Sequence, residues 1–175
     1  MTSEQSVVPR AVPSLPALAD KAVQLLQAAI PPSSVQLVTR IALAVPFWRS
    51  GILKWDGFLR LGDTAVTLFS DEFMLHLPGG PYHFPLPSVM AFLSACGEVS
   101  FPVLLILGLG TRFAALGLLF MTCIVELTVP DGWPIHLTWA AMALGLIVHG
   151  PGRISLDHVL GTLFGAHQGS ARRGI

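Results

Sequence analysis

The sequence predicts an all-α membrane protein, an up-and-down bundle of four transmembrane helices with short interfacial amphipathic helices. Only 11% of its 175 residues are charged and 53% are hydrophobic, whereas soluble domains carry roughly 25% charged residues. Four apolar segments are long enough to cross a bilayer, which needs about 20 residues per helix. The connections after the second and third segments are short, and short connections place consecutive helices antiparallel.

Composition divides the chain into three parts. Residues 1–34 form a cytoplasmic N-terminal segment, in which LADKAVQLLQAAI predicts an amphipathic helix that ends before two prolines. Residues 35–164 form the membrane domain, and residues 165–175 form a basic C-terminal tail. The predicted spans are Val35–Trp55, Leu86–Leu109, Phe113–Val129 and Trp133–His149.

Two segments outside the spans show helical periodicity. After the fourth span, Ser155 predicts a helix N-cap and Asp157 favours the first turn of that helix. Its apolar stripe is Leu156, Val159, Leu160, Leu163 and Phe164. In the loop between the first two spans, a similar spacing with acidic residues in between predicts a helix lying flat on the outer leaflet. The apolar residues of that loop helix are Phe58, Leu61, Ala65, Leu68, Phe69 and Phe73.

The distribution of Lys and Arg predicts the orientation, because cytoplasmic flanks carry the excess of these residues. One side holds six of them, namely Arg10, Lys21, Arg112, Arg153, Arg172 and Arg173. The other side holds Lys54 and Arg60 among several acidic residues. Both termini are therefore predicted in the cytoplasm. The formal net charge of zero gives no electrostatic reason to expect nucleic acid as a partner.

Ionisable residues inside the spans are the strongest functional signal, because each costs roughly 2.5–3.5 kcal/mol near the centre of a span. Arg40 and Arg49 lie nine positions apart in the first span, which places them on opposite faces. Glu98 of the second span falls between them in depth. We therefore expect Glu98 to pair with one arginine, while the other snorkels or meets a different group.

A second polar layer is predicted near the outer surface. Glu126 and His136 lie on adjacent antiparallel spans, and Lys54 can reach the same level. His136 and Trp139 share one helix face, so a polar pocket walled by Trp139, together with Trp133 and Trp48, can open outward there. The alternative is structural: buried charges that fix helix register, and tryptophans that anchor the helices at the interface.

Metal, haem and disulfide chemistry have weaker support in the sequence. His76 and His83 match no strong ligand spacing, so no metal site is predicted. His136 and His149 lie at opposite ends of one span and cannot ligate one haem iron together. Cys96 and Cys123 fall inside predicted spans without CxxC spacing and are expected to behave as small hydrophobes.

Several segments resemble the DoxX family of membrane proteins, over about residues 36 to 163. The segment RIALAVPFWRSGILKW resembles the first helix of the family, with Arg40, Ser50, Gly51 and Lys54 in matching places. The segment GEVSFPVLLILGLGTRFAALGLLFMT resembles its second and third helices, and HLTWAAMALGLIVHGPGRISLDHVLG resembles its ending. Those two stretches carry matching residues at Glu98, Pro102, Gly108, Thr111, Arg112, His136, Trp139, Arg153 and Asp157. Arg49 is not a family position.

The resemblance implies a multi-pass protein of the bacterial inner membrane with both termini inside. The family takes its name from subunits of a thiosulfate:quinone oxidoreductase, and other members are associated with thiol and oxidative-stress systems or are encoded beside metal-handling proteins. A quinone is the cofactor that this resemblance suggests. The implied partners are the lipid bilayer and a membrane or soluble redox protein, and a homo-oligomer stays open.

Two functions from different classes follow. The first is a membrane subunit of a redox system, an oxidoreductase subunit acting with a partner in the quinone-linked oxidation of a small sulfur compound or thiol. Its predicted catalytic residues are Glu98, Glu126 and His136, and its predicted substrate-binding residues are Arg40, Arg49, Lys54 and Trp139. The second is a non-enzymatic scaffold or transporter for a small molecule or metal, with helix breaks at Pro46 and Pro102.

Overall fold

The computed structural model describes the backbone of residues 14–171 and the side chains of these residues except 17 and 165–171. The chain divides into two compact units, residues 1–32 and residues 33–175. The first unit contains α1 (Leu15–Ala29), which has a proline in its first turn and ends at Ile30. This helix matches the amphipathic helix predicted for the N-terminal segment. Arg10, Arg172 and Arg173 lie outside the described residues.

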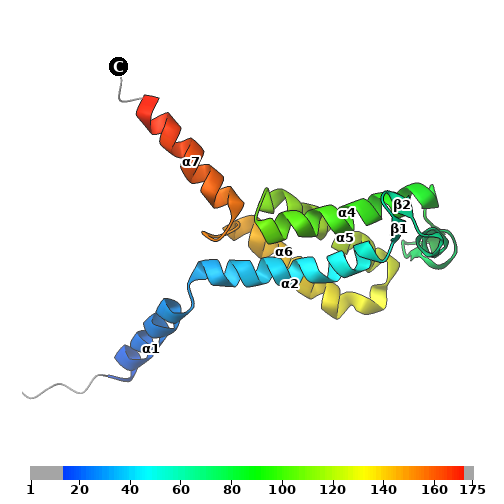
Figure 1. The fold of residues 1–175 in the computed structure, drawn as a ribbon. Coiled ribbons are helices and arrows are strands. Elements are labelled where there is room, and N and C mark those ends of the chain that lie inside the picture. The colour runs from blue at the N-terminus through cyan, green and yellow to red at the C-terminus, as the bar shows by residue number, and fades with distance from the viewer. Residues whose placement is uncertain (1–13, 172–175) are drawn as a thin grey trace, which may run out of the picture. The chain divides into compact units, whose positions relative to one another are not determined.

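The second unit is mostly helical and contains four long helices that run side by side (Figure 1). They are α2 (Pro32–Ile52), α4 (Pro87–Leu107), α5 (Thr111–Thr128) and α6 (Trp133–His149). Each coincides closely with one predicted span. By length and composition α4 and α5 can each cross a membrane, and a third crossing results if α1 and α2 are counted together. These findings indicate an all-α membrane protein.

Local sequence explains where these helices begin and end. Pro87 opens α4, where its missing N–H leaves no donor unpaired. Gly108 and Gly110 both have positive φ, at +69° and +56°, so the chain turns sharply between α4 and α5. Pro46 and Pro102 lie inside α2 and α4, and both helices continue through them. The helix breaks that we considered at these two prolines are therefore wrong.

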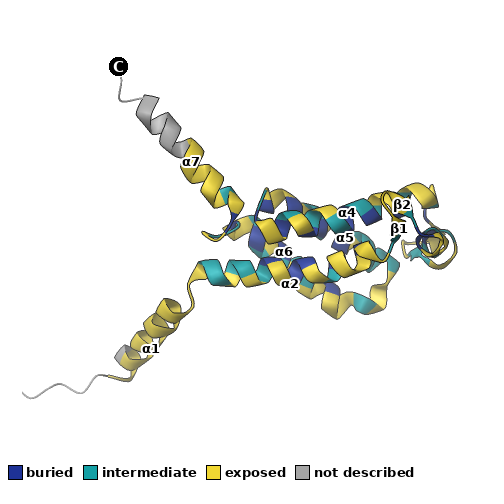
Figure 2. Ribbon diagram, in the orientation of Figure 1, coloured by how far each residue is buried: buried dark blue, intermediate teal, exposed yellow. Residues whose placement is uncertain are grey.

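Small side chains let the four helices approach one another. The buried core is Leu43, Ala44, Phe47, Leu105, Ala114, Ala115, Leu118, Ala143 and Leu146. Helix α5 packs along both α4 and α6, and α2 completes the core with Leu43, Ala44 and Phe47. Buried positions recur along all four helices, whereas the described half of α7 (Leu156–Ala171) is largely exposed (Figure 2). Alanines dominate the α5 contacts, as is typical where helices associate within a membrane.

The loop between α2 and α4 differs from its prediction. It forms a hairpin of β1 (Trp55–Gly57) and β2 (Arg60–Leu61), then α3 (Asp63–Thr67) and a π-helical turn, η1 (Leu68–Glu72). A second short hairpin, β3 (Met74–Leu75) and β4 (Tyr82–His83), follows. The continuous helix expected from Phe58 is therefore wrong over its first turn, where Phe58 sits exposed in the hairpin loop. Ala65 and Phe69, in contrast, are buried.

Helices α2 and α4 approach each other closely at Gly51. A Cβ added there would lie 2.8 Å from Glu98 Cβ and 2.9 Å from the Glu98 carbonyl oxygen. Real Cβ atoms do not approach other atoms this closely, and the obstruction is partly backbone, which cannot rotate away. Gly51 therefore fixes the separation of the two helices at the level of Glu98.

Substituting Gly51→Ala is expected to lower the free energy of unfolding by about 3 kcal/mol, the upper end of the usual range for overpacking. The measurement is an unfolding titration in mixed micelles. Gly145→Ala on α6 is the matched control, because no atom lies within 4 Å of its added Cβ. The control should change stability by less than about 1 kcal/mol, in the stabilising direction. Equal stability of both variants would show that α2 and α4 do not pack as described.

Candidate functional site

A buried ion pair joins the end of α2 to the middle of α4. Lys54 Nζ lies 2.5 Å from Glu98 Oε2, with side-chain exposures of 11% and 7%. Lys54 also donates to Ser50 Oγ at 2.8 Å, and Ser94 donates to Glu98 Oε1 at 2.7 Å. Each charged group thus has a serine four positions earlier in the chain. Both charged groups therefore have hydrogen-bond partners close by, as charges at this depth in a membrane helix require.

The partner of Glu98 is therefore a lysine, and the predicted pairing with an arginine is wrong. Lys54 lies in the turn after α2, where its N–H donates to the Gly51 carbonyl oxygen at 3.1 Å. Its flexible four-carbon stem reaches Glu98 from there. Among the described side chains, Lys54 pairs with Glu98, whereas Glu126 pairs with His136.

The Lys54–Glu98 pair faces a cavity of about 440 Å³, here called the α4–α5 cavity. One face of α4 and one face of α5 form its walls, and Phe69, Phe73 and Phe84 of the preceding loop also line it. Phe69 and Phe84 are buried, with ring centroids 5.2 Å apart. The lining is apolar except near the ion pair and at one threonine, Thr128. Small-molecule sites in proteins typically have volumes of roughly 300–1,000 Å³. The α4–α5 cavity falls within this range and is therefore the candidate binding site.

Arg40 lies far from this cavity. It is 1% exposed and donates from Nη2 to the Ile154 carbonyl oxygen at 2.5 Å. Eleven residues separate it from Gly51 in α2, which corresponds to about 16 Å along the axis. Asp157 is close enough to interact with its charge. The structure thus places Arg40 in a cluster at the opposite end of the helices, and its predicted proximity to Glu98 is wrong.

That cluster ties α7 to the turn between α4 and α5. The Asp157 carboxylate accepts from the Gly110 N–H at 2.7 Å and the Thr111 N–H at 2.9 Å, and so caps the N-terminus of α5. The Asp157 N–H donates in turn to the Gly108 carbonyl oxygen at 2.8 Å. Ser155 Oγ accepts from the His158 N–H at 3.2 Å, which confirms the predicted cap of α7.

The remaining predicted residues are distributed over other surfaces. Arg49 is exposed on α2, on a different face from the buried Arg40. Trp139 packs against Phe47, with ring centroids 5.0 Å apart, and is part of the core. None of these side chains lines the α4–α5 cavity, and neither do Trp48 or Trp133. The aromatic side chains that line the α4–α5 cavity are phenylalanines, so this cavity is not the pocket predicted beside Trp139.

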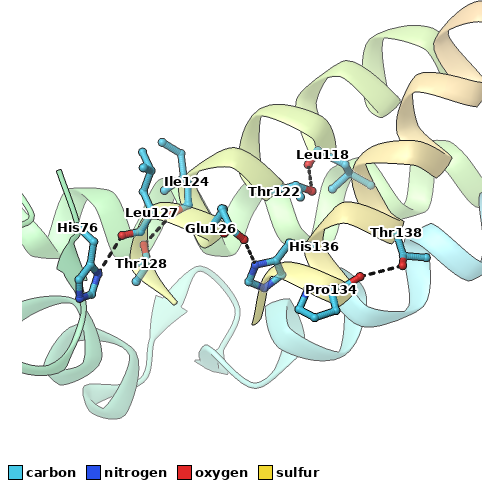
Figure 3. A network of polar contacts seen from close by, with 10 residues as sticks. All are labelled: His76, Leu118, Thr122, Ile124, Glu126, Leu127, Thr128, Pro134, His136 and Thr138. Atoms are coloured by element: carbon cyan, nitrogen blue, oxygen red, sulfur yellow. Dashed lines mark hydrogen bonds and ion pairs between the residues drawn. The ribbon is translucent and has the colours of Figure 1, made fainter. Parts of the chain in front are cut away.

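Glu126, near the end of α5, and His136, near the start of α6, meet between these two helices (Figure 3). Glu126 Oε2 lies 2.7 Å from His136 Nδ1, and the His136 ring packs against Trp139 with centroids 5.3 Å apart. His136 is buried, whereas Glu126 is 40% exposed at its side chain. This is the adjacency that their positions on antiparallel spans predicted. Neither residue lines the α4–α5 cavity.

The outer loop is fastened to α5 close to this pair. The His76 N–H donates to the Leu127 carbonyl oxygen at 2.7 Å, and the ring nitrogen Nδ1 of His76 lies 3.1 Å from the same oxygen (Figure 3). Among the side chains that the structure describes, no three His, Cys, Asp or Glu residues gather into a group that can hold a metal. Cys96 and Cys123 are both free, with Cys123 exposed.

Neither Ser94 nor the role of Ser50 beside Lys54 was predicted from the sequence. Both serines precede their charged partner by four positions, a spacing that brings side chains together on one helix face. That spacing is visible in SGILK and SACGE and is the signal that could have identified them. The phenylalanines of the loop between α2 and α4 recur at helical spacing, but no sequence pattern indicates that they line a cavity.

Comparison with known proteins shows to which proteins this chain is related. The DoxX family matches residues 35–131. An uncharacterized protein of Haemophilus influenzae is 30% identical over 135 residues, which cover 71% of this chain and 82% of that protein. No solved structure matches. The family match covers more than half of the sequence and includes both members of the buried ion pair, so the chain belongs to the DoxX family of membrane proteins.

Proposed function

We propose that this protein is a membrane subunit of a redox system that binds a quinone headgroup in the α4–α5 cavity. The observation that supports it best is the buried Lys54–Glu98 pair facing an otherwise apolar cavity. Structural ion pairs are usually packed in on all sides, whereas this one borders open space. Charged groups buried beside a cavity within a membrane are candidate functional groups by default.

The chemistry of the cavity fits a quinone. Such a molecule has a flat apolar ring with two carbonyl oxygens, which accept hydrogen bonds. Lys54 supplies an ammonium donor, and Ser50 and Ser94 supply hydroxyl groups at the same end. Phe101 lines the wall, where its aromatic face can pack against the ring.

When bound, a quinone would supply two-electron redox chemistry coupled to the uptake of protons. Within this chain, Glu98 is placed to hold a proton, and Lys54 to donate hydrogen bonds to a carbonyl oxygen. The apolar walls keep bulk water from both groups, which strengthens their electrostatic interactions. The electrons come from a partner protein that oxidises the small sulfur compound or thiol. We assign Glu126 and His136 no contact with the headgroup.

The membrane placement is part of the same proposal. We infer that α2, α4, α5 and α6 all cross the bacterial inner membrane as an up-and-down bundle, with both termini in the cytoplasm. The excess of Lys and Arg on the side of the termini supports this orientation. The cavity and its phenylalanine cover then lie in the outer half of the bundle, and Arg40 and Asp157 lie at its cytoplasmic end.

Native mass spectrometry tests the proposal on protein purified gently from its own membranes. We expect a bound mass equal to that of a quinone, together with a soluble or membrane oxidoreductase that co-purifies. An unrelated multi-pass protein purified from the same membranes controls for quinone that is carried over with lipid. Phospholipids alone, or a metal ion, would contradict the proposal and favour a scaffold or transport function.

A further inference from the structure

The walls of the α4–α5 cavity are not equally closed. At the outer end, Phe69 packs against Phe73 and Phe84 with ring centroids 5.3 and 5.2 Å apart. Phe69 and Phe84 are both buried, and they also pack against Ala91 of α4. These rings pack together at the end of the cavity that lies toward the α2–α4 loop.

The side of the cavity between α4 and α5 is open instead. Leu93 of α4 and Phe120 of α5 both line the cavity, and they are 57% and 66% exposed. Both lie well inside apolar helices that can cross a membrane. A side chain exposed at that position contacts hydrocarbon rather than water. The mouth of the cavity therefore faces the lipid.

The polar groups lie at the inner end of this path. Glu98 is buried, and Ser94 holds one of its oxygens while Lys54 holds the other. A ligand that enters between Leu93 and Phe120 thus passes apolar side chains first and reaches charge last. An amphiphile with one polar head and one apolar chain matches this order. A small water-soluble anion does not, because it would have to cross hydrocarbon to reach the mouth.

The geometry points to a lateral mouth that admits a membrane-dissolved amphiphile, with its head at Lys54 and Glu98 and its chain leaving between Leu93 and Phe120 into the bilayer. This inference rests on the proposed quinone site and deepens it. It makes the long-chain, lipid-resident form of the quinone the ligand. It also excludes this cavity as the site of the soluble sulfur compound, which must therefore react on the partner protein.

Equilibrium binding of two radiolabelled probes to the full-length protein in nanodiscs tests the inference. Both probes carry the same dimethoxy-methylbenzoquinone head, one with a decyl chain and the other without. Leu93→Trp enlarges a side chain at the mouth and is expected to weaken binding of the decyl probe at least about tenfold, or 1.4 kcal/mol. Binding of the chain-free probe should stay within about twofold. Ile106→Trp is the control, an exposed position on α4 outside the cavity.

A second variant at the mouth, Phe120→Ala, removes the ring on the opposite side and should also weaken the decyl probe selectively. Two results separate the inference from the proposal on which it rests. If both probes bind the wild type equally, or Leu93→Trp weakens both alike or neither, the lateral mouth is wrong and the headgroup site stands. If neither probe binds the wild type, the quinone site itself is wrong, and the inference fails with it.

Discussion

Glu98→Gln is expected to abolish quinone-linked turnover while the protein remains folded in the membrane. Glutamine keeps the shape of the side chain and can still accept the hydrogen bond from Ser94. It can neither hold the proton nor balance the charge of Lys54. Loss of a positioned acid–base group typically lowers rates by about 10²–10⁴. We therefore expect turnover to fall at least about 100-fold.

The measurement is quinone reduction by the purified complex, with folding followed by circular dichroism and size-exclusion chromatography. Glu72→Gln, an exposed position in η1, is the matched control and should keep wild-type turnover. Turnover that survives in Glu98→Gln would show that the ion pair serves architecture alone.

A double variant separates catalysis from stability. In Glu98→Gln alone, Lys54 is a buried charge without its partner, which typically costs about 3–5 kcal/mol. Adding Lys54→Met removes that charge, so stability should recover by most of this amount. Turnover should not recover, because the hydrogen-bond donor at the inner end of the cavity is now also missing.

Asp157→Asn is expected to lower the free energy of unfolding by about 3 kcal/mol or more. The carboxylate accepts from two backbone N–H groups at the start of α5, and hydrogen bonds to a charged group contribute about 1.5–3 kcal/mol each. Asparagine offers one acceptor oxygen and no charge, so one N–H loses its partner and the nearby Arg40 loses its counter-charge.

An unfolding titration in mixed micelles measures this effect. Asp131→Asn is the control, because Asp131 is exposed in the short helix η2 (Pro130–Gly132), and surface changes of this kind stay within about 0.5 kcal/mol. Binding of the decyl probe should survive at concentrations where the variant is folded, since Asp157 does not line the α4–α5 cavity. A stability equal to that of the control would contradict the capping role.

The long helices could be predicted because a membrane span needs a continuous apolar run, and such runs are read directly from the sequence. The Ser155 cap was predictable for a similar reason, since capping depends on residues three positions apart. The partner of Asp157 was not, because Gly110 and Thr111 lie 47 and 46 residues away in the chain. No local pattern encodes a contact of that range.

The pairing of Glu98 failed for a geometric reason. Counting residues along straight helices compares backbone depths and placed Glu98 between Arg40 and Arg49. Lys54 lies beyond the end of α2, yet its long side chain spans the difference. Arg40 in turn finds a backbone carbonyl oxygen, which any residue could have supplied. Depth along a helix therefore predicts which charges share a layer only for short side chains.

The Asp157 cap also has a consequence for biogenesis. Membrane proteins are made from the N-terminus, so α5 emerges from the ribosome well before the residue that caps it. During that interval the amide groups of Gly110 and Thr111 have only water or lipid headgroups as partners. The final packing of the α4–α5 turn is thus delayed until translation passes residue 157. A nascent chain released before that point lacks the contact that caps the start of α5.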